Sequence, residues 1–509
     1  METVNYVSHP MIKDGSVERR LYQETILASA VKDNTLVVLP TGIGKTVIAV
    51  LVAAHCLDKN GGKFLIMAPT KPLVEQHRNS FAKFLEIGSD GLKVFTGKSN
   101  PEKREKEYSE AMGVFATPQV IQNDVISGKI DLSKFSLLIV DECHRAVKDY
   151  PYPFIAEMFV RRSSGKILGL TASPGGTREK INEICKNLFI KNVEIRTEKD
   201  SDVSPYIQKV DIEWRTASLP KEFKEALSVL GDVYRERLQA LKAIGAINSV
   251  SVRRKDLLLL QGQLSAKIKD NDPLVFQGIS LAAEALKIEH GIMLLETQGS
   301  KSLLEYMKRL REQSEQGKSK AVKRLMSDPR IRATFNTIHA MVQNGVEHPK
   351  IGILEKVLDE QFAINPGSKV IVFSQYRDSV SELVKVLAKR YRPVAFVGQK
   401  EGLTQKEQME IIRKFSDNEY NCLVCTSIGE EGLDIPAVDL VVFYEPVSSE
   451  IRSIQRRGRT GRQSAGHVII LMTSGTRDEA YYWISRNHEK KMKETLKNFS
   501  SGQRGLRDF

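Results

Sequence analysis

The chain has 509 residues, of which 41% are hydrophobic and 27% are charged. This length exceeds one ordinary domain, and the composition excludes both a small disulfide-stapled scaffold and a broadly disordered protein. Lysine and arginine outnumber aspartate and glutamate by 76 to 63, which gives a formal net charge of +13. A positive excess suits a polyanionic partner such as nucleic acid, although a merely soluble basic surface would produce the same count.

No apolar run reaches the length of a membrane span, and the first ten residues lack a secretory-signal pattern. We therefore expect a cytoplasmic protein with no membrane partner. Five cysteines are present, too few and too scattered for a disulfide framework or a four-ligand zinc site. The close pair Cys422 and Cys425 lies in an apolar run, which favours a buried strand over a metal site.

Short apolar runs alternate with longer helical patterns from about residue 20 to 200. These runs predict strands at 35–39, 63–68, 92–96, 114–117, 136–140 and 166–170. The repeated strand-helix order predicts a parallel sheet with helices on both faces. After residue 350 the same order returns, with predicted strands at 369–373, 393–397, 421–425, 439–444 and 467–472. The fold class is therefore α/β, with two parallel-sheet domains.

Between these domains the strand signals disappear and helical patterns replace them. The predicted regions are a first α/β domain at 1–216, an all-helical insertion at 217–345, a second α/β domain at 346–497 and a polar, poorly ordered tail at 498–509.

The helical insertion carries much of the positive charge. From Lys221 to Lys350 there are 22 basic and 15 acidic residues, a net charge of +7. The excess is concentrated at 253–255 and 318–332. This concentration predicts a nucleic-acid surface on the insertion, with solvated helix faces as the alternative.

The segment 39–46 (LPTGIGKT) follows a predicted strand and precedes a helical run, as a phosphate-binding loop does. Gly42 and Gly44 would let backbone N–H groups point at phosphate oxygens. Lys45 would reach the β- and γ-phosphates, and Thr46 would hold Mg²⁺. Leu39 stands where the strict pattern has glycine, so a chance glycine-rich turn is the alternative.

Two carboxylates, Asp141 and Glu142, follow the apolar run 136–140. Open α/β folds bind ligands at the carboxyl edge of their strands, which is where these residues would emerge. Asp141 can hold Mg²⁺, and Glu142 can orient or deprotonate an attacking water. Beside a phosphate-binding loop, the pair predicts hydrolysis as well as binding.

With these motifs in place, the chain resembles superfamily-two helicases of the DEAD/DEAH-box type. Further segments that resemble the family are 20–23 (RLYQ, the Q motif), 171–173 (TAS, motif III), 426–434 (TSIGEEGLD, motif V) and 455–462 (QRRGRTGR, motif VI). The resemblance covers both α/β domains. It implies that they are RecA-like motor domains that close on ATP and Mg²⁺.

The resemblance also implies roles for individual residues. The expected nucleotide contacts are Arg20, Gln23, Thr41, Gly42, Gly44, Lys45, Thr46, Gly432 and Asp434, and the expected metal ligands are Thr46 and Asp141. The expected catalytic residues are Lys45, Asp141, Glu142, Gln455, Arg459 and Arg462, and the expected coupling residues are His144, Thr171 and Ser173. Arg459 and Arg462, three residues apart, could both face a γ-phosphate across the cleft between the domains.

Segments 68–76, 117–120 and 374–377 resemble motifs Ia, Ib and IV, which bind nucleic-acid phosphates without reading bases. The expected nucleic-acid contacts are Thr70, Lys71, Thr117, Gln119, Ser374, Gln375, Arg377 and Thr426, with Arg253, Arg254 and Lys255 in the insertion. Taken alone, Thr70 and Thr117 are each better explained as helix caps.

Within the superfamily, the loop, motif Ia, motif V and the helical insertion are most similar to archaeal Hef helicases and their relatives FANCM and Mph1. This implies a thumb-like insertion and an ATP-dependent helicase or translocase that remodels stalled forks and Holliday junctions in DNA repair. It also implies a prokaryotic, archaeal, nucleoid-associated protein. A nuclease or clamp partner cannot be identified from the sequence.

Two alternatives stay open. Cys143, in the segment DECH, is commoner in Dicer and antiviral RNA-sensor helicases, so an ATPase stimulated by double-stranded RNA is the first alternative. An ATP-gated clamp on branched DNA without processive unwinding is the second, because it needs the same ATP site. The Glu-Arg-Lys hallmark of the nuclease found in many Hef proteins does not occur, so we expect no nuclease activity.

Overall fold

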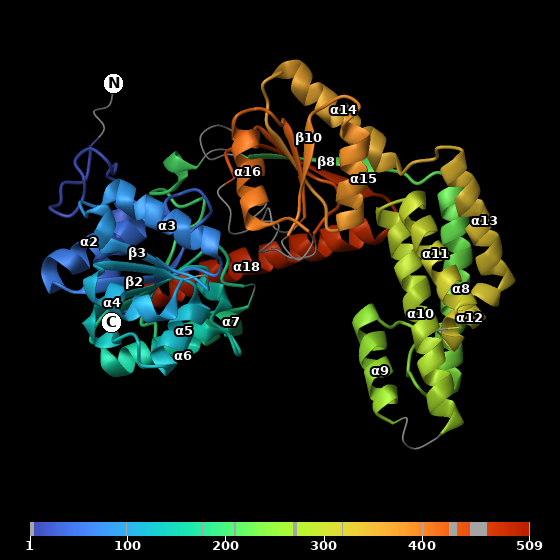
Figure 1. The fold of residues 1–509 in the computed structure, drawn as a ribbon, viewed down its shortest axis with the longest axis horizontal. Coiled ribbons are helices and arrows are strands. Elements are labelled where there is room, and N and C mark those ends of the chain that lie inside the picture. The colour runs from blue at the N-terminus through green and yellow to red at the C-terminus, as the bar shows by residue number, and fades with distance from the viewer. Residues whose placement is uncertain are drawn as a thin grey trace.

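The computed structural model describes residues 5–97, 99–175, 177–207, 210–267, 272–317, 319–398, 402–426, 435–447 and 466–507. Figure 1 shows three parts: a first parallel sheet with its helices, a second parallel sheet with its helices, and a bundle of long helices beside the second sheet. The predicted α/β fold, with two parallel-sheet domains and an all-helical insertion, is confirmed.

The first sheet has seven strands in the order β3-β4-β2-β5-β6-β1-β7, and all its pairings are parallel. Its strands are β1 (Thr35–Val38), β2 (Lys63–Met67), β3 (Leu92–Phe95), β4 (Gly113–Ala116), β5 (Phe135–Val140), β6 (Lys166–Thr171) and β7 (Asn192–Ile195). Because the strands run the same way, all their carboxyl ends lie at one edge of the sheet.

Helices cover both faces of the first sheet, which explains why its strands are apolar runs instead of alternating patterns. One face carries α1 (Leu21–Ala30), α2 (Lys45–Asn60) and α3 (Lys71–Phe84). The other carries α4 (Pro101–Glu110), α5 (Pro118–Ile126), α6 (Pro151–Arg162) and α7 (Arg178–Asn187). In β1, Leu36 and Val38 enter one core while Val37 enters the other.

The second sheet has six parallel strands in the order β10-β11-β9-β12-β13-β8. Its strands are β8 (Val210–Ala217), β9 (Val370–Phe373), β10 (Pro393–Phe396), β11 (Cys422–Cys425), β12 (Leu440–Phe443) and β13 (Gly466–Thr473), and its helices include α14 (Pro349–Ile364), α15 (Arg377–Leu387) and α16 (Gln405–Ser416). Cys422 and Cys425 are fully buried in β11, so the prediction of a buried strand at this pair is confirmed.

One strand crosses the predicted domain boundary. The predicted first domain, 1–216, includes nearly all of β8. This strand instead pairs along its whole length with β13 of the second sheet. Trp214 of β8 packs against the core of that second sheet. The boundary therefore lies before β8, because a pairing with a strand some 250 residues later determines where it belongs.

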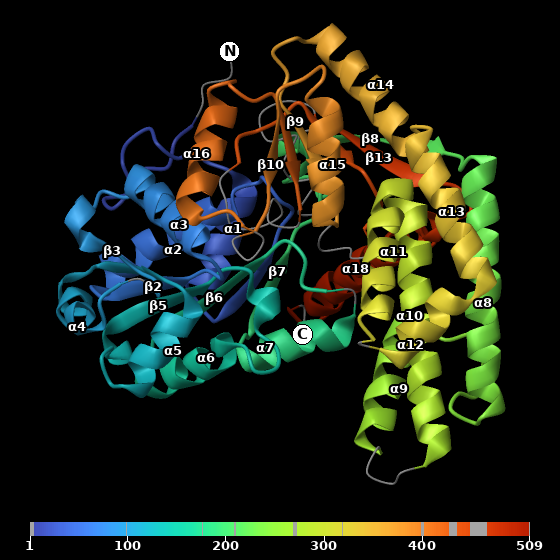
Figure 2. The ribbon, with the colours of Figure 1, turned by 45° about the vertical axis from the view of Figure 1, so that its right-hand side comes forward.

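The insertion is a helical bundle formed by α8 (Lys221–Ala243), α9 (Arg254–Ala266), α10 (Pro273–Thr297), α11 (Ser300–Glu315), α12 (Lys320–Ser327) and α13 (Pro329–Gln343). In Figure 2 the long helices α8 and α10 run along the bundle, with α9 at its far end. Apolar side chains on the inward faces of these helices form two buried clusters, so the bundle has a core of its own.

The last helix, α18 (Arg477–Arg507), leaves the second sheet and reaches the first domain (Figure 1). Met492 of α18 is 3% exposed and belongs to the core of the first domain. Residues 498–507 continue this helix, whereas the sequence analysis expects a polar, poorly ordered tail at 498–509. The segment contains Gln, Arg and Leu, which favour helix, but also Asn, Ser and two glycines, which do not, so the helix there continues from the turns before it.

None of the helices in the described part of the chain combines the length and apolar character needed to span a membrane.

Candidate active site

The loop after β1 has the backbone of a phosphate-binding loop. Gly42 and Gly44 have φ values of 84° and 87°, a left-handed conformation that side chains other than glycine rarely adopt. Lys45 begins α2, and its Nζ donates to the carbonyl oxygens of Leu39 and Pro40 at 3.3 Å each. The lysine therefore lies across the loop, where it can reach phosphate groups bound by the backbone N–H groups.

A buried glutamine on α1 lies next to the phosphate-binding loop. Gln23 is 2% exposed, and its Nε2 donates to the Tyr22 hydroxyl at 3.2 Å. The Tyr22 hydroxyl in turn donates to the carbonyl oxygen of Ile43, which joins α1 to the loop. A Cβ added at Gly44 would lie 2.9 Å from Gln23 Nε2, so the loop and the glutamine pack against each other.

Gln23 also provides a test of whether ATP fits. Its Oε1 is buried and has no hydrogen-bond partner among the described residues. A buried carbonyl oxygen without a partner is unfavourable unless a donor such as the amino group of adenine fills the position. Nearby, the guanidinium of Arg20 lies 4.4 Å above the ring of Tyr206 and pairs with Glu18. These two contacts fix the side chain of Arg20 near Gln23.

The two predicted carboxylates emerge where β5 ends. Asp141 is 7% exposed, and its Oδ2 lies 2.8 Å from His77 Nε2. Burial by itself would raise the pKa of Asp141, but His77 and Lys45 outweigh it and lower that pKa, so the carboxylate stays ionised. Glu142 has a left-handed backbone with φ 48°, and its Oε2 lies 3.2 Å from His144 Nδ1. The charge of Lys45 acts on Asp141, and Thr46 follows Lys45 in the first turn of α2. An ionised carboxylate and a threonine hydroxyl are oxygen donors of the kind that Mg²⁺ takes, so these residues fit the ion.

The structure joins the three predicted coupling residues. His144 Nδ1 lies 3.2 Å from Thr171 Oγ1 at the end of β6, and the Thr171 hydroxyl accepts from the backbone N–H of Ser173 at 3.1 Å. Ser173 Oγ is buried without a hydrogen-bond partner among the described residues. The hydrogen-bonded chain therefore runs from His144 to the loop after β6, while Glu142 Oε2 lies close to His144 without a hydrogen-bond partner among the described residues.

Thr70 and Thr117, two of the predicted nucleic-acid contacts of the first domain, each lie at the start of a helix. They are the N-cap residues of α3 and α5, which follow the neighbouring strands β2 and β4. Neither side chain makes a capping hydrogen bond, so the alternative that they serve as caps is not supported. Lys71 pairs with Glu75 at 3.4 Å, and Gln119 is exposed.

The predicted contacts of the second domain are only partly at the surface. Ser374 is fully buried and its hydroxyl donates to Glu445 at 3.0 Å, so it has a structural role in place of the predicted nucleic-acid contact. Gln375 donates to the carbonyl oxygen of Pro446 at 2.9 Å. Thr426 is 3% exposed, whereas Arg377 is exposed at the start of α15. The predicted residues Gly432, Asp434, Gln455, Arg459 and Arg462 lie outside the described residues.

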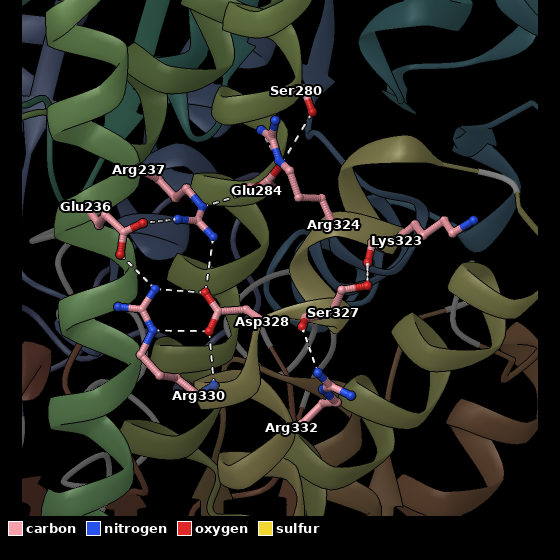
Figure 3. A network of polar contacts seen from close by, with 10 residues as sticks. All are labelled: Glu236, Arg237, Ser280, Glu284, Lys323, Arg324, Ser327, Asp328, Arg330 and Arg332. Atoms are coloured by element: carbon pink, nitrogen blue, oxygen red, sulfur yellow. Dashed lines mark hydrogen bonds and ion pairs between the residues drawn. The ribbon is translucent and has the colours of Figure 1, made fainter.

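Much of the positive charge of the bundle is compensated within it. Figure 3 shows Arg237 between the carboxylates of Glu284 and Asp328, at 2.8 and 3.3 Å. Arg324 pairs with Glu284 at 2.6 Å, and Arg330 pairs with Asp328 at 2.8 Å. Glu284 is fully buried, so these pairs hold the bundle together. The predicted nucleic-acid surface at 318–332 is therefore weaker than its charge count indicates.

In the basic cluster at the start of α9, residues 253–255, one side chain is also ion-paired with another helix. Arg254 pairs with Glu289 of α10 while its side chain remains 44% exposed, so the pair positions Arg254 and its contact with nucleic acid stays a prediction. The side chain of Arg253 is 85% exposed, with Asp256 at 3.2 Å, and Lys255 is exposed. The side chains of Arg253, Arg254 and Lys255 thus all face solvent, and Arg254 is the one paired with another helix.

His77 is the site residue that the sequence analysis missed. Its signal was its place in α3, where Val74, His77 and Phe81 form the buried stripe. A histidine in an otherwise apolar stripe requires a polar partner inside the protein. Only the fold shows that this partner is Asp141.

Three family descriptions match the chain in sequence order. "DEAD/DEAH box helicase" matches residues 20–181, and "Helicase conserved C-terminal domain" matches residues 349–464. A helical-bundle family named after ATP-dependent RNA helicases matches residues 222–348.

Full-length relatives are similar along nearly the whole chain. MJ1505 of Methanocaldococcus jannaschii, whose name assigns it as an ATP-dependent RNA helicase, is 43% identical over 97% of this chain and 62% of its own length. The ATP-dependent DNA helicase mph1 of Neurospora crassa is 34% identical over 92% of this chain and 42% of its own. The ATP-dependent DNA helicase fml1 of Schizosaccharomyces pombe is 31% identical over 94% and 60%. The chain thus spans less than two thirds of each of these relatives.

A solved structure matches almost completely. The crystal structure of the Pyrococcus furiosus Hef helicase domain is 44% identical, with a TM-score of 0.74 over 92% of this chain and 98% of that one. The chain therefore belongs to the superfamily-two DEAD/DEAH-box helicases, a family of ATP-hydrolysing enzymes, and within them to the Hef, Mph1 and Fml1 (FANCM) group.

Proposed function

We propose that this chain is an ATP-dependent DNA helicase or translocase that binds branched DNA, such as stalled forks and Holliday junctions, and remodels it during repair. The observation that carries the proposal is that three elements meet at one edge of the first sheet. They are the phosphate-binding loop, the acidic pair Asp141 and Glu142, and Gln23 with its buried, unpartnered oxygen.

In this proposal Gln23 binds the base and Lys45 binds the β- and γ-phosphates. Thr46 and Asp141 would hold Mg²⁺, which neutralises charge on the phosphates when bound. Glu142 orients the attacking water and accepts its proton. The contacts from Glu142 through His144 to Thr171 would then report the state of the site to the loop after β6.

The second half of the ATP site is also a proposal. Arg459 and Arg462 of motif VI would add positive charge at the γ-phosphate when the domains close. Gln455 beside them would position water or phosphate, and Gly432 and Asp434 would contact the nucleotide. Hydrolysis would release that closure, so that each cycle moves the two domains relative to each other.

The choice of DNA rests on the relatives. Mph1 and Fml1 are named DNA helicases, and the solved relative is a Hef helicase domain. Double-stranded RNA is the alternative, since MJ1505 and the helical-bundle family are named after RNA helicases. A clamp that remodels DNA without processive unwinding would use the same ATP site. The protein would act at the nucleoid of a prokaryotic cytoplasm, and no partner protein is proposed.

The proposed nucleic-acid surface is smaller than the sequence indicates. On the first domain it consists of the helix starts at Thr70, Lys71, Thr117 and Gln119, which offer hydroxyl, ammonium and amide groups to phosphates. On the second domain and the bundle it consists of the exposed side chains of Arg377, Arg253, Arg254 and Lys255. These groups recognise a backbone and carry no base information.

The test is steady-state ATP hydrolysis with forked DNA, linear duplex DNA, single-stranded DNA and double-stranded RNA at one fixed salt concentration. We expect the fork to give the largest stimulation. Stimulation by double-stranded RNA alone would overturn the choice of DNA, and no stimulation by any of the four would overturn the motor function. A strand-displacement assay on the same fork then distinguishes unwinding from a clamp.

A further inference from the structure

α3 contacts three different regions of the protein. Its first residues, Thr70 and Lys71, lie at the proposed nucleic-acid surface. Its buried stripe faces the core and the ATP site through His77. Its outer face forms one wall of a groove whose other wall is α16 of the second domain, with Gln76 on one side and Met409 on the other. A single rigid helix therefore contacts all three places that a motor must coordinate.

His77 is the polar connection between α3 and the acidic pair. The side chain is 6% exposed, and Nε2 lies 2.8 Å from Asp141 Oδ2. Nδ1 is buried without a hydrogen-bond partner among the described residues, so Asp141 is the polar group that orients the ring. Because the acceptor is a carboxylate, Nε2 carries the hydrogen. Asp141 is further fixed through its backbone, where its N–H donates to Met67 at 2.9 Å and its carbonyl oxygen accepts from Tyr152 at 2.8 Å.

We propose that His77 is a positioning residue that transmits the binding of nucleic acid and of the second domain at α3 to the carboxylate of Asp141. A movement of α3 moves the imidazole, and the hydrogen bond carries this movement to Oδ2. The backbone contacts of Asp141 keep its main chain in place, so the movement reorients the carboxylate alone. The proposal rests on the proposed function, and it adds the route by which nucleic acid stimulates hydrolysis.

The physical requirement is a donor at the position of Nε2. His77→Gln places an amide nitrogen near that position, whereas His77→Asn is shorter and places its amide near the position of Nδ1. His77→Leu removes the donor and retains the apolar stripe. The matched control is His55→Gln in the second half of α2, the same substitution at a half-buried histidine of the same domain.

The first readout is the ratio of ATP turnover with forked DNA to turnover without it. We expect His77→Leu and His77→Asn to lower this ratio about tenfold, whereas His77→Gln and His55→Gln retain it. Thermal unfolding checks that each variant is folded. If His77→Leu does not fold, the comparison of His77→Gln with His77→Asn carries the test.

The second readout does not depend on turnover. The affinity for forked DNA is measured by fluorescence anisotropy with and without a non-hydrolysable ATP analogue and Mg²⁺. If nucleic acid bound at α3 changes the affinity for the analogue and Mg²⁺, the analogue changes the affinity for forked DNA by the same factor, and we expect such a change in the wild type. In His77→Leu we expect the effect of the analogue to disappear, with the nucleotide-free affinity unchanged.

The outcomes separate the two proposals. A wild-type protein stimulated by nucleic acid, together with a His77→Leu or His77→Asn variant that retains stimulation and coupling, overturns the role of His77 and leaves the proposed function standing. Equal loss in His77→Gln and His77→Asn overturns the donor argument. A wild-type protein that no nucleic acid stimulates overturns both.

Discussion

The junction between the bundle and the second domain contains a histidine with two structural hydrogen bonds. His348 Nδ1 accepts from the backbone N–H of Lys350 at 3.3 Å and so caps α14. Its Nε2 donates to the carbonyl oxygen of Glu296 in α10 at 3.0 Å. Only a neutral imidazole with hydrogen on Nε2 makes both bonds. Burial and then the charge of Lys350 lower the pKa of His348 from 6.5 to about 3.

This shift makes stability depend on pH in a known direction. The unfolded chain takes up a proton on His348 near pH 6.5, whereas the folded protein does so only near pH 3. Between these values the unfolded state binds more protons, so the free energy of unfolding decreases as the pH falls below 6.5. With a slope near 1.4 kcal/mol per pH unit, the contribution lost by about pH 5 is roughly 2 kcal/mol.

The assay is urea unfolding of the wild type and of His348→Asn at about pH 7.5 and about pH 5. Asparagine retains an acceptor for the cap of α14 but does not titrate in this range. We expect the wild type to lose about 2 kcal/mol more than the variant between the two pH values. Equal losses in the two proteins would refute the assignment of the neutral, buried imidazole, because every other titrating group is common to both.

Three further predictions concern lysines and arginines in different surroundings. Lys45→Ala should abolish ATP hydrolysis while the affinity for forked DNA, measured by fluorescence anisotropy, stays unchanged; residual turnover near the wild-type rate would contradict the site. Lys350→Met leaves the buried carboxylate of Asp478 without the ammonium 3.0 Å away, and should cost about 3–5 kcal/mol in urea unfolding. A cost below about 1 kcal/mol would show that the pair is not desolvated. Replacing both Arg253 and Lys255 by alanine should weaken forked-DNA binding and reduce its salt dependence by about one or two phosphate contacts, and an unchanged slope would exclude them from the surface.

The placement of the phosphate-binding loop and the acidic pair at one edge of the first sheet could be predicted because short-range sequence determines both. Gly42, Gly44 and Lys45 follow one strand within a few residues, and Asp141 and Glu142 follow another. Parallel strands then bring their carboxyl ends to one edge, whatever the order of the strands between them. Local motifs and one general rule for parallel sheets were therefore sufficient to place the loop and the acidic pair together.

The remaining features depend on partners far away in the sequence. Arg254 counts as a free positive charge in any tally, but it pairs with Glu289 of another helix, a carboxylate that it shares with Arg477. Ser374 has the residue type of a phosphate contact, but Glu445 of another loop binds its hydroxyl in the interior. β8 has the pattern of any strand, but its pairing with β13 assigns it to the second sheet. Composition and spacing describe what a residue can do, and only the fold shows which partner it has.

α18 connects the bundle and the second domain to the first domain through long-range contacts. In its first turn Arg477 pairs with Glu289 and Glu296 of the bundle, and Asp478 pairs with Lys350 of α14. Met492, about 20 Å further along the helix axis at 1.5 Å per residue, is buried in the first domain. An intact helix resists stretching because each turn is hydrogen-bonded to the next. A rotation of the first domain against the second about an axis across α18 must therefore bend this helix or displace Met492, and the first turn of the same helix is ion-paired to the bundle.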